Sequence, residues 1–90
     1  MSTPKVQMYT ADWCPYCARA RRLLQAKGVP FEEIDVDASP ENRAQMVARS
    51  GRHTVPQIFV GDVHVGGSDE LLARDAAGTL DPLIKPRNES

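Results

Sequence analysis

Both cysteines of the chain lie within one four-residue stretch, C-P-Y-C at residues 14–17. Residues 6–10 have the composition of a buried strand, and residues 18–27 have the apolar spacing of one side of a helix. The stretch therefore lies where a strand passes into a helix. A C-x-x-C pair at such a junction in a short chain favours a redox-active pair.

The start of this helix is the feature that gives the two cysteines different roles. Proline suits the first helical position because it lacks an N–H that would be unpaired there, so Pro15 makes Cys14 the N-cap. Its sulfur can then accept hydrogen bonds from the free N–H groups of Tyr16 and Cys17. Because a helix start favours thiolate, we expect Cys14 to attack and Cys17, about one turn later, to resolve the resulting mixed disulfide.

The cysteine pair has two other possible roles. The pair could be half of a zinc site, or it could be an inert part of the core. The remaining zinc ligands would be His53 and His64, but ten residues separate them, which does not match H-x3-5-H spacing. No metal is therefore expected.

Length and composition limit the classes of protein to which the chain can belong. Ninety residues predict one domain, 1–90, ending in a polar tail at 85–90, and 41% apolar residues are enough for one core. A net charge of −1 argues against a nucleic-acid surface. No apolar run approaches the ~20 residues of a membrane span. Residues 1–5 lead into a strand without the pattern of a signal peptide, so a cytoplasmic location is expected. A monomer is the default expectation for the oligomeric state.

The middle of the chain predicts a parallel strand and a second helix. Residues 31–36 read as a strand that pairs in parallel with the first, because a helix connects the two. Ser39 and Pro40 begin a helix that runs to about Ser50, where Gly51 ends it. Its inward residues are expected to be Ala44, Val47 and Ala48, with Met46 filling a gap.

The last third predicts a hairpin and a third helix. Residues 57–60 and 63–65 are strands joined by a two-residue Gly-Asp turn. A helix begins near Ser68 and ends at Gly78, and a last apolar turn follows at 80–84. The inward residues of that helix are expected to be Leu71, Leu72 and Ala76. The predicted order is β-α-β-α-β-β-α, a thin α/β protein.

Three motifs occur in order over nearly the whole chain: C-P-Y-C at 14–17, T-V-P at 54–56 and G-G-S-D at 66–69. With these separations the chain resembles the glutaredoxins of the dithiol C-P-Y-C class. The resemblance implies a thioredoxin-like fold, in which a four-stranded mixed sheet is flanked by three helices. It also implies a cis peptide bond before Pro56 and a site for glutathione as co-substrate.

The resemblance also assigns residues by position. Cys14 and Cys17 are the catalytic cysteines. The backbone of Val55 pairs with the cysteinyl part of glutathione like an added strand, Ser68 and Asp69 bind its γ-glutamyl end, and Gln57 faces its glycyl carboxylate. The implied glutathione-binding residues are Tyr16, Thr54, Val55, Pro56, Gln57, Gly67, Ser68 and Asp69.

The chain departs from the glutaredoxin pattern at Ala11. Glutaredoxins commonly carry Lys or Arg three residues before the first cysteine, and here Ala11 is followed by Asp12, an acid. We expect Cys14 to stay nucleophilic because of the helix start, and the glycyl carboxylate to be held less firmly. His53, before T-V-P, is expected to substitute in part for the missing cation.

The implied activity is that of a glutathione-dependent thiol–disulfide oxidoreductase. Its partners would be glutathione and glutathionylated or disulfide-containing proteins, with ribonucleotide reductase as one candidate. One alternative is a hydrogen donor recharged by thioredoxin reductase. Another is a dimer that holds a [2Fe–2S] cluster with two Cys14 thiolates and two glutathiones, although cluster-carrying relatives typically have C-G-F-S.

Overall fold

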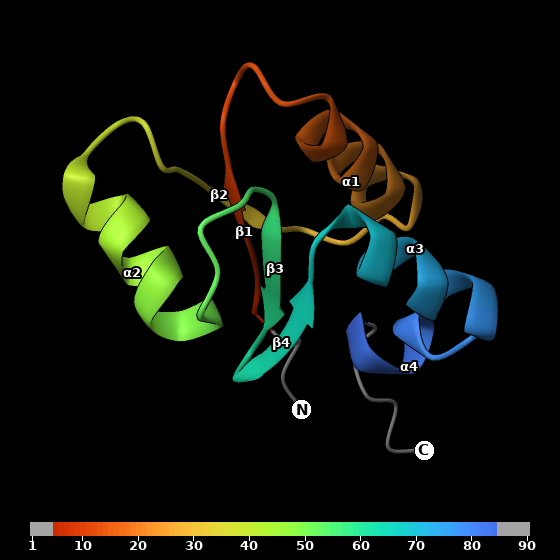
Figure 1. The fold of residues 1–90 in the computed structure, drawn as a ribbon. Helices are drawn as coiled ribbons and strands as arrows, with labels where there is room; N and C mark the ends of the chain where they lie inside the picture. The colour runs from red at the N-terminus through yellow and green to blue at the C-terminus, as the bar shows by residue number, and fades with distance from the viewer. Residues whose placement is uncertain (1–4, 85–90) are drawn as a thin grey trace.

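The computed structural model describes residues 5–84, and the tail predicted at 85–90 lies outside them. Strands and helices alternate as far as a hairpin of two strands, and a pair of helices follows the hairpin (Figure 1). The elements are β1 (Val6–Thr10), α1 (Pro15–Ala26), β2 (Glu32–Asp35), α2 (Pro40–Ser50), β3 (Gln57–Val60), β4 (Val63–Gly66), α3 (Ser68–Ala77) and α4 (Leu80–Ile84). The predicted order is confirmed, and the predicted last apolar turn is the short helix α4.

The strands form one mixed sheet in the order β2-β1-β3-β4. β1 runs parallel to β2 and antiparallel to β3, and β3 is antiparallel to β4. In the two central strands Tyr9 lies opposite Gln57. The loop that follows β1 and the loop that precedes β3 therefore meet at the same end of the sheet, and these loops carry the C-P-Y-C and T-V-P motifs.

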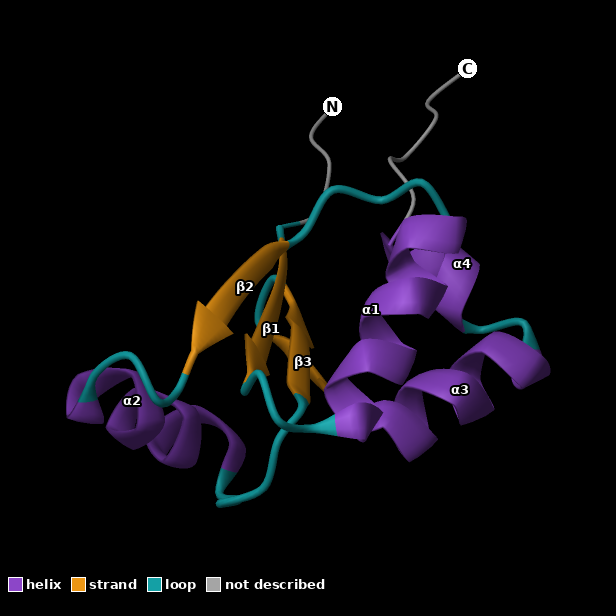
Figure 2. Cartoon of the chain, turned by 90° about the horizontal axis from the view of Figure 1, so that it is seen from above, coloured by secondary structure: helices purple, strands orange, loops and turns teal. Residues whose placement is uncertain are grey.

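Helices cover both faces of the sheet, with α1, α3 and α4 on one side and α2 on the other (Figure 2). The core under the three helices combines Met8 and Ile58 of the central strands with Leu24, Leu71 and Leu80 of the helices, all fully buried. Each such side chain contributes roughly 1.5–3 kcal/mol by leaving water. This larger core holds the start of α1, and with it the cysteines, against the sheet.

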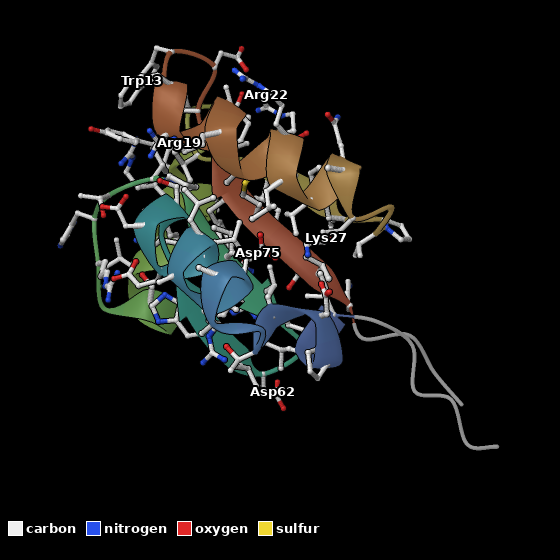
Figure 3. The ribbon with its side chains drawn as sticks, turned by 90° about the vertical axis from the view of Figure 1, so that its right-hand side faces the viewer. Trp13, Arg19, Arg22, Lys27, Asp62 and Asp75 are labelled. Carbon is white, nitrogen blue, oxygen red and sulfur yellow. The ribbon has the colours of Figure 1, made fainter. Side chains whose placement is uncertain are left out.

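An ion pair ties the end of α1 to the two helices that follow the sheet. The ammonium group of Lys27 lies 2.8 Å from a carboxylate oxygen of Asp81 and also contacts Asp75. Figure 3 shows the Lys27 side chain turned toward Asp75. Both contacts raise the pKa of Lys27, the contact with Asp75 more strongly, and they keep the side chain charged.

The inward residues of α3 differ in part from those predicted. Leu71 is buried and Leu72 is half-buried, but Ala76 is exposed, contrary to expectation.

The smaller core lies under α2, and its residues differ from those predicted. Met46 is fully buried with Tyr9 and Phe59, whereas Val47 is half-buried and Ala44 and Ala48 are exposed. The expectation for the two alanines is wrong.

The reason is that α2 turns a largely polar side to the sheet. Gln45 accepts a hydrogen bond from the buried Tyr9 hydroxyl. Arg49 donates a hydrogen bond to the Tyr9 hydroxyl oxygen at 2.9 Å. The Arg49 guanidinium also lies 4.0 Å from the centre of the Phe59 ring. Positions 42, 45, 46 and 49 form one helix face by their spacing, and only Met46 among them is apolar.

We predict that Met46→Ala lowers the free energy of unfolding by about 2–4 kcal/mol, because it leaves a cavity beside Tyr9 and Phe59. The control is Ala48→Ser on the exposed side of the same helix, which should cost about 0.5 kcal/mol or less. Urea unfolding followed by circular dichroism measures both. Equal losses in the two variants would contradict the orientation of α2 described here.

Candidate functional site

Cys14 caps α1, as predicted, but its sulfur is used differently. The helix begins at Pro15, and Cys14 has the extended backbone of an N-cap, with φ −93° and ψ 113°. No side-chain capping hydrogen bond forms, so the bonds expected from Tyr16 and Cys17 are absent here. The Cys14 thiol instead donates to the carbonyl oxygen of Val55 at 3.6 Å. A thiol carries a proton and can serve as this donor, whereas a thiolate can only accept.

Cys17 lies one turn further along α1, on its buried side. It is 0% exposed, compared with 5% for Cys14. Burial raises the pKa of the Cys17 thiol, and hydrogen bonds from the Thr10 hydroxyl and the Ala11 N–H oppose that rise. A hydrogen bond with Cys14 also raises it. Cys14 is therefore the more accessible of the two sulfurs.

The loop before β3 brings Val55 to Cys14. The Val55–Pro56 peptide bond is cis, as the resemblance implies. Gln57, 1% exposed, donates from its amide nitrogen to the Thr54 carbonyl oxygen at 3.1 Å and to the Thr54 hydroxyl at 3.2 Å. Its amide oxygen lies 2.7 Å from Nε2 of His64. Gln57 therefore holds the loop in place, and the contact predicted with a glycyl carboxylate would require these bonds to break.

The turn between β4 and α3 forms the opposite wall. Gly66 has a φ of +118°, and a Cβ added there would lie 2.8 Å from a carboxylate oxygen of Glu70. Only glycine fits this position without displacing Glu70. The Glu70 carboxylate accepts a hydrogen bond from the Gly67 N–H at 2.7 Å, which lowers its pKa. Arg52, 3.3 Å from the other carboxylate oxygen, lowers the pKa further.

A pocket of about 200 Å³ lies between these segments. Every glutathione-binding residue predicted from the sequence lines it, together with two that were not predicted. The lining is Tyr16, Arg52, Thr54, Val55, Pro56, Gln57, Gly67, Ser68, Asp69 and Glu70. Glu70 could have been recognised from its spacing, because an acid three residues after an N-cap commonly bonds back to it.

Arg52 supplies the cation of this pocket. His53 was expected to substitute for the basic residue missing at position 11, but its side chain lines a second depression, beside α2 residues such as Ala44 and Val47. The sequence feature that could have identified Arg52 is its positive charge two residues before the T-V-P motif. A second cation, Arg19, lies at the other end, 3.9 Å from Asp69 and 5.8 Å from the centre of the Tyr16 ring.

Two aromatic side chains are exposed on the surface near Cys14. Trp13 is 68% exposed and Tyr16 54%. The Trp13 indole N–H donates to Asp37 at 2.9 Å, and Arg43 also donates to Asp37. These two donors lower the pKa of Asp37, Trp13 more strongly. Large exposed aromatic side chains on either side of a reactive sulfur are suited to contact with a protein substrate.

Metal ligands do not gather in the described part of the chain. Between residues 5 and 84 no group of three or more His, Cys, Asp or Glu side chains is placed to hold an ion.

Comparison with known proteins identifies glutaredoxins as relatives of this chain. The glutaredoxin family model matches residues 6–65. The chain is 54% identical over 81 residues to a glutaredoxin of Pseudomonas aeruginosa, covering 90% of this chain and 96% of the relative. It is 54% identical over 80 residues to glutaredoxin 3 of Escherichia coli K12, covering 89% and 96%.

Solved structures agree in fold. The solution structure of glutaredoxin from Brucella melitensis superposes with a TM-score of 0.83 at 56% identity, covering 94% of this chain and 92% of that one. A crystal structure of a buckwheat glutaredoxin–glutathione complex superposes with a TM-score of 0.82 at 26% identity, covering 90% and 76%. The predicted thioredoxin-like fold is confirmed.

We predict that limiting iodoacetamide at neutral pH modifies Cys14 well before Cys17 in the reduced protein. Cys17 is fully buried, and its raised pKa keeps it in the unreactive thiol form. Fragment-ion mass spectrometry of the peptide that carries both residues measures the order. Preferential labelling of Cys17 would contradict the assignment.

Proposed function

The chain belongs to the glutaredoxin family and is a thiol–disulfide oxidoreductase, and we propose that glutathione is the co-substrate that reduces it. The proposed catalytic residues are Cys14 as nucleophile and Cys17 as resolving thiol. The observation that carries the proposal is the contact between the Cys14 sulfur and the Val55 carbonyl oxygen, 3.6 Å apart, at the edge of the pocket. A peptide that pairs with the Val55 backbone would bring its own sulfur to Cys14.

The polar groups of the pocket match the charges of glutathione, a tripeptide with one ammonium group and two carboxylates. The start of α3 offers the free N–H of Ser68 to the γ-glutamyl carboxylate, because helix starts bind anions. Asp69, 90% exposed, can accept from the ammonium group. Arg52 would bind the glycyl carboxylate. In glutaredoxins that role commonly belongs to a basic residue at the position of Ala11, which has no charge. The buckwheat relative, solved as a complex with glutathione, supports this ligand.

The proposed reaction has a monothiol route. The Cys14 thiolate attacks the glutathione sulfur of a glutathionylated protein, whose own sulfur leaves as a thiol after taking up a proton. Cys14 then carries glutathione as a mixed disulfide. A second glutathione thiolate attacks that disulfide, and oxidised glutathione leaves the restored Cys14.

The second route uses both cysteines. Cys14 attacks a protein disulfide, Cys17 attacks Cys14 of the resulting mixed disulfide, and the substrate leaves reduced. Glutathione then reduces the Cys14–Cys17 disulfide.

The proposed partners are glutathionylated and disulfide-containing proteins. Three features stay predictions: ribonucleotide reductase as a partner, a monomeric state and a cytoplasmic location. Between residues 5 and 84 no helix has the length and apolar character that crossing a bilayer requires.

The proposal is tested by the turnover of a glutathionylated peptide with glutathione, NADPH and glutathione reductase. We expect steady NADPH consumption that depends on this protein. Negligible consumption, with activity appearing when thioredoxin reductase replaces glutathione and its reductase, would refute glutathione dependence and favour the alternative hydrogen donor.

We predict that Cys17→Ser keeps turnover of the glutathionylated peptide and loses reduction of a protein disulfide by the dithiol route. Cys14→Ser should lose both activities, because the nucleophile itself is gone. Parallel assays with the two substrates measure the effect. Loss of both activities in Cys17→Ser would contradict the assignment of roles to the two cysteines.

We predict that Arg52→Ala raises the KM for glutathione by about three- to fivefold, the effect of losing up to ~1 kcal/mol from an exposed ion pair. His53→Ala is the matched control, since the neighbouring side chain lines the other depression, and its KM should stay unchanged. Steady-state kinetics with varied glutathione separates KM from kcat. A larger effect from His53→Ala would restore the role expected for that residue.

A further inference from the structure

The side-chain amide of Gln57 holds the loop before β3, and its hydrogen bonds fit one orientation of the amide. The amide nitrogen donates to the Thr54 carbonyl oxygen at 3.1 Å and to the Thr54 hydroxyl oxygen at 3.2 Å. If the amide were turned over, its oxygen would face the Thr54 carbonyl oxygen, and both atoms can only accept. Because Gln57 is only 1% exposed, solvent cannot readily replace a lost bond.

His64 pairs with the remaining atom of this amide. Strand β4 lies beside β3, and His64 lies opposite Phe59 (Figure 1). Nε2 of His64 is 2.7 Å from the amide oxygen of Gln57. The imidazole also stacks on the Phe59 ring, with the ring centres 4.7 Å apart and the planes 21° from parallel. The stacking restricts the imidazole to an orientation in which Nε2 faces Gln57.

The contact between the two side chains requires a proton on Nε2. The amide oxygen of Gln57 can only accept, so the hydrogen bond forms only if Nε2 of His64 donates. Burial lowers the pKa of His64. The positive charges of Arg52 and Arg49 lower it further, and the carboxylate of Glu70 opposes them. The ring is therefore neutral near pH 7.5, where only one of its two nitrogens carries a proton.

His64 does not line the pocket, so its route to the site is this series of hydrogen bonds. The series runs from His64 through Gln57 to Thr54. Thr54 directly precedes Val55, whose carbonyl oxygen meets the Cys14 sulfur at 3.6 Å. The backbone beside the nucleophile is thereby tied to a side chain on the neighbouring strand.

We propose that His64 is a positioning residue. By donating from Nε2 to Gln57, it fixes the amide that holds Thr54, and with it the Val55 backbone with which a glutathionylated substrate would pair. The inference rests on the proposed function for that pairing. His64 touches neither substrate nor sulfur, so its effect falls on how well the substrate is held and not on the reactivity of Cys14.

The first test needs no variant. Long-range proton–nitrogen NMR correlation near pH 7.5 distinguishes the imidazole nitrogen that carries a proton from the one that does not. We expect His64 to carry its proton on Nε2, and the side-chain amide protons of Gln57 to exchange slowly with solvent. A proton on Nδ1 of His64 would overturn the proposal.

The second test separates the hydrogen bond of His64 from its stacking. His64→Phe keeps a ring against Phe59 and removes the donor. His64→Gln removes the ring and places an amide nitrogen as many bonds from the backbone as Nε2. We expect His64→Phe to lower kcat/KM for a glutathionylated peptide about fivefold, the effect of one hydrogen bond, and His64→Gln to stay within about twofold of the unaltered protein. Equal losses, the opposite order or no loss in His64→Phe would overturn the proposal.

Alkylation of Cys14 by iodoacetamide distinguishes positioning from general damage to the site. The Val55 carbonyl oxygen accepts from the Cys14 thiol and so stabilises its protonated form. A displaced carbonyl therefore should not slow alkylation in His64→Phe. Alkylation that slows in proportion to turnover would overturn the proposal.

A double-mutant cycle tests whether His64 acts through Gln57. Gln57→Met removes the amide and keeps a side chain of similar length. We expect it to lower kcat/KM by itself, and His64→Phe to lower kcat/KM no further in that background. A further fivefold loss would overturn the proposal.

The NMR test holds even if a variant does not fold, and it does not depend on glutathione. A proton on Nε2 without turnover of the glutathionylated peptide by the unaltered protein would refute glutathione dependence alone. The same variants would then be compared in the reduction of a disulfide-bridged peptide, where the same order is expected and equal rates would overturn the proposal.

Discussion

The antiparallel pairing of β1 with β3 is the contact on which the site depends. It places Tyr9 opposite Gln57, so the loop that follows one strand lies beside the loop that precedes the other. Cys14 and Val55, 41 residues apart in sequence, are thereby brought to a sulfur–oxygen distance of 3.6 Å. The third wall of the pocket follows from the hairpin, because β4 returns beside β3 and ends at the turn from which α3 begins. The pocket is thus positioned by the sheet.

The division of labour between the cysteines follows from their positions on one helix. The N-cap leaves Cys14 at the edge of the pocket, and Cys17, one turn further along, lies on the buried side of α1. The more accessible sulfur can meet a substrate, whereas the buried sulfur can meet only Cys14. Burial raises the pKa of the Cys17 thiol and makes it a poor nucleophile toward outside reagents.

Most of this fold was predictable because its signals are local. Pro15 and Pro40 at helix starts, and Gly51 and Gly78 at helix ends, marked the boundaries that the structure has. The face of α2 was not predictable from apolar spacing, because Gln45 and Arg49 contact Tyr9 with polar groups. In the site, every residue predicted to bind glutathione lines the pocket. The sequence did not predict the role of Arg52. Of two adjacent basic residues, Arg52 and His53, the one that faces the pocket is determined by the path of the loop.

The most direct test of this account is a crystal structure of the Cys17→Ser protein with glutathione joined to Cys14. We predict that the cysteinyl backbone of glutathione pairs with the Val55 backbone, that its γ-glutamyl carboxylate lies at the Ser68 N–H, and that its glycyl carboxylate lies within reach of Arg52. Glutathione that extends from Cys14 away from Val55, along Trp13 and the α2 depression, would contradict it.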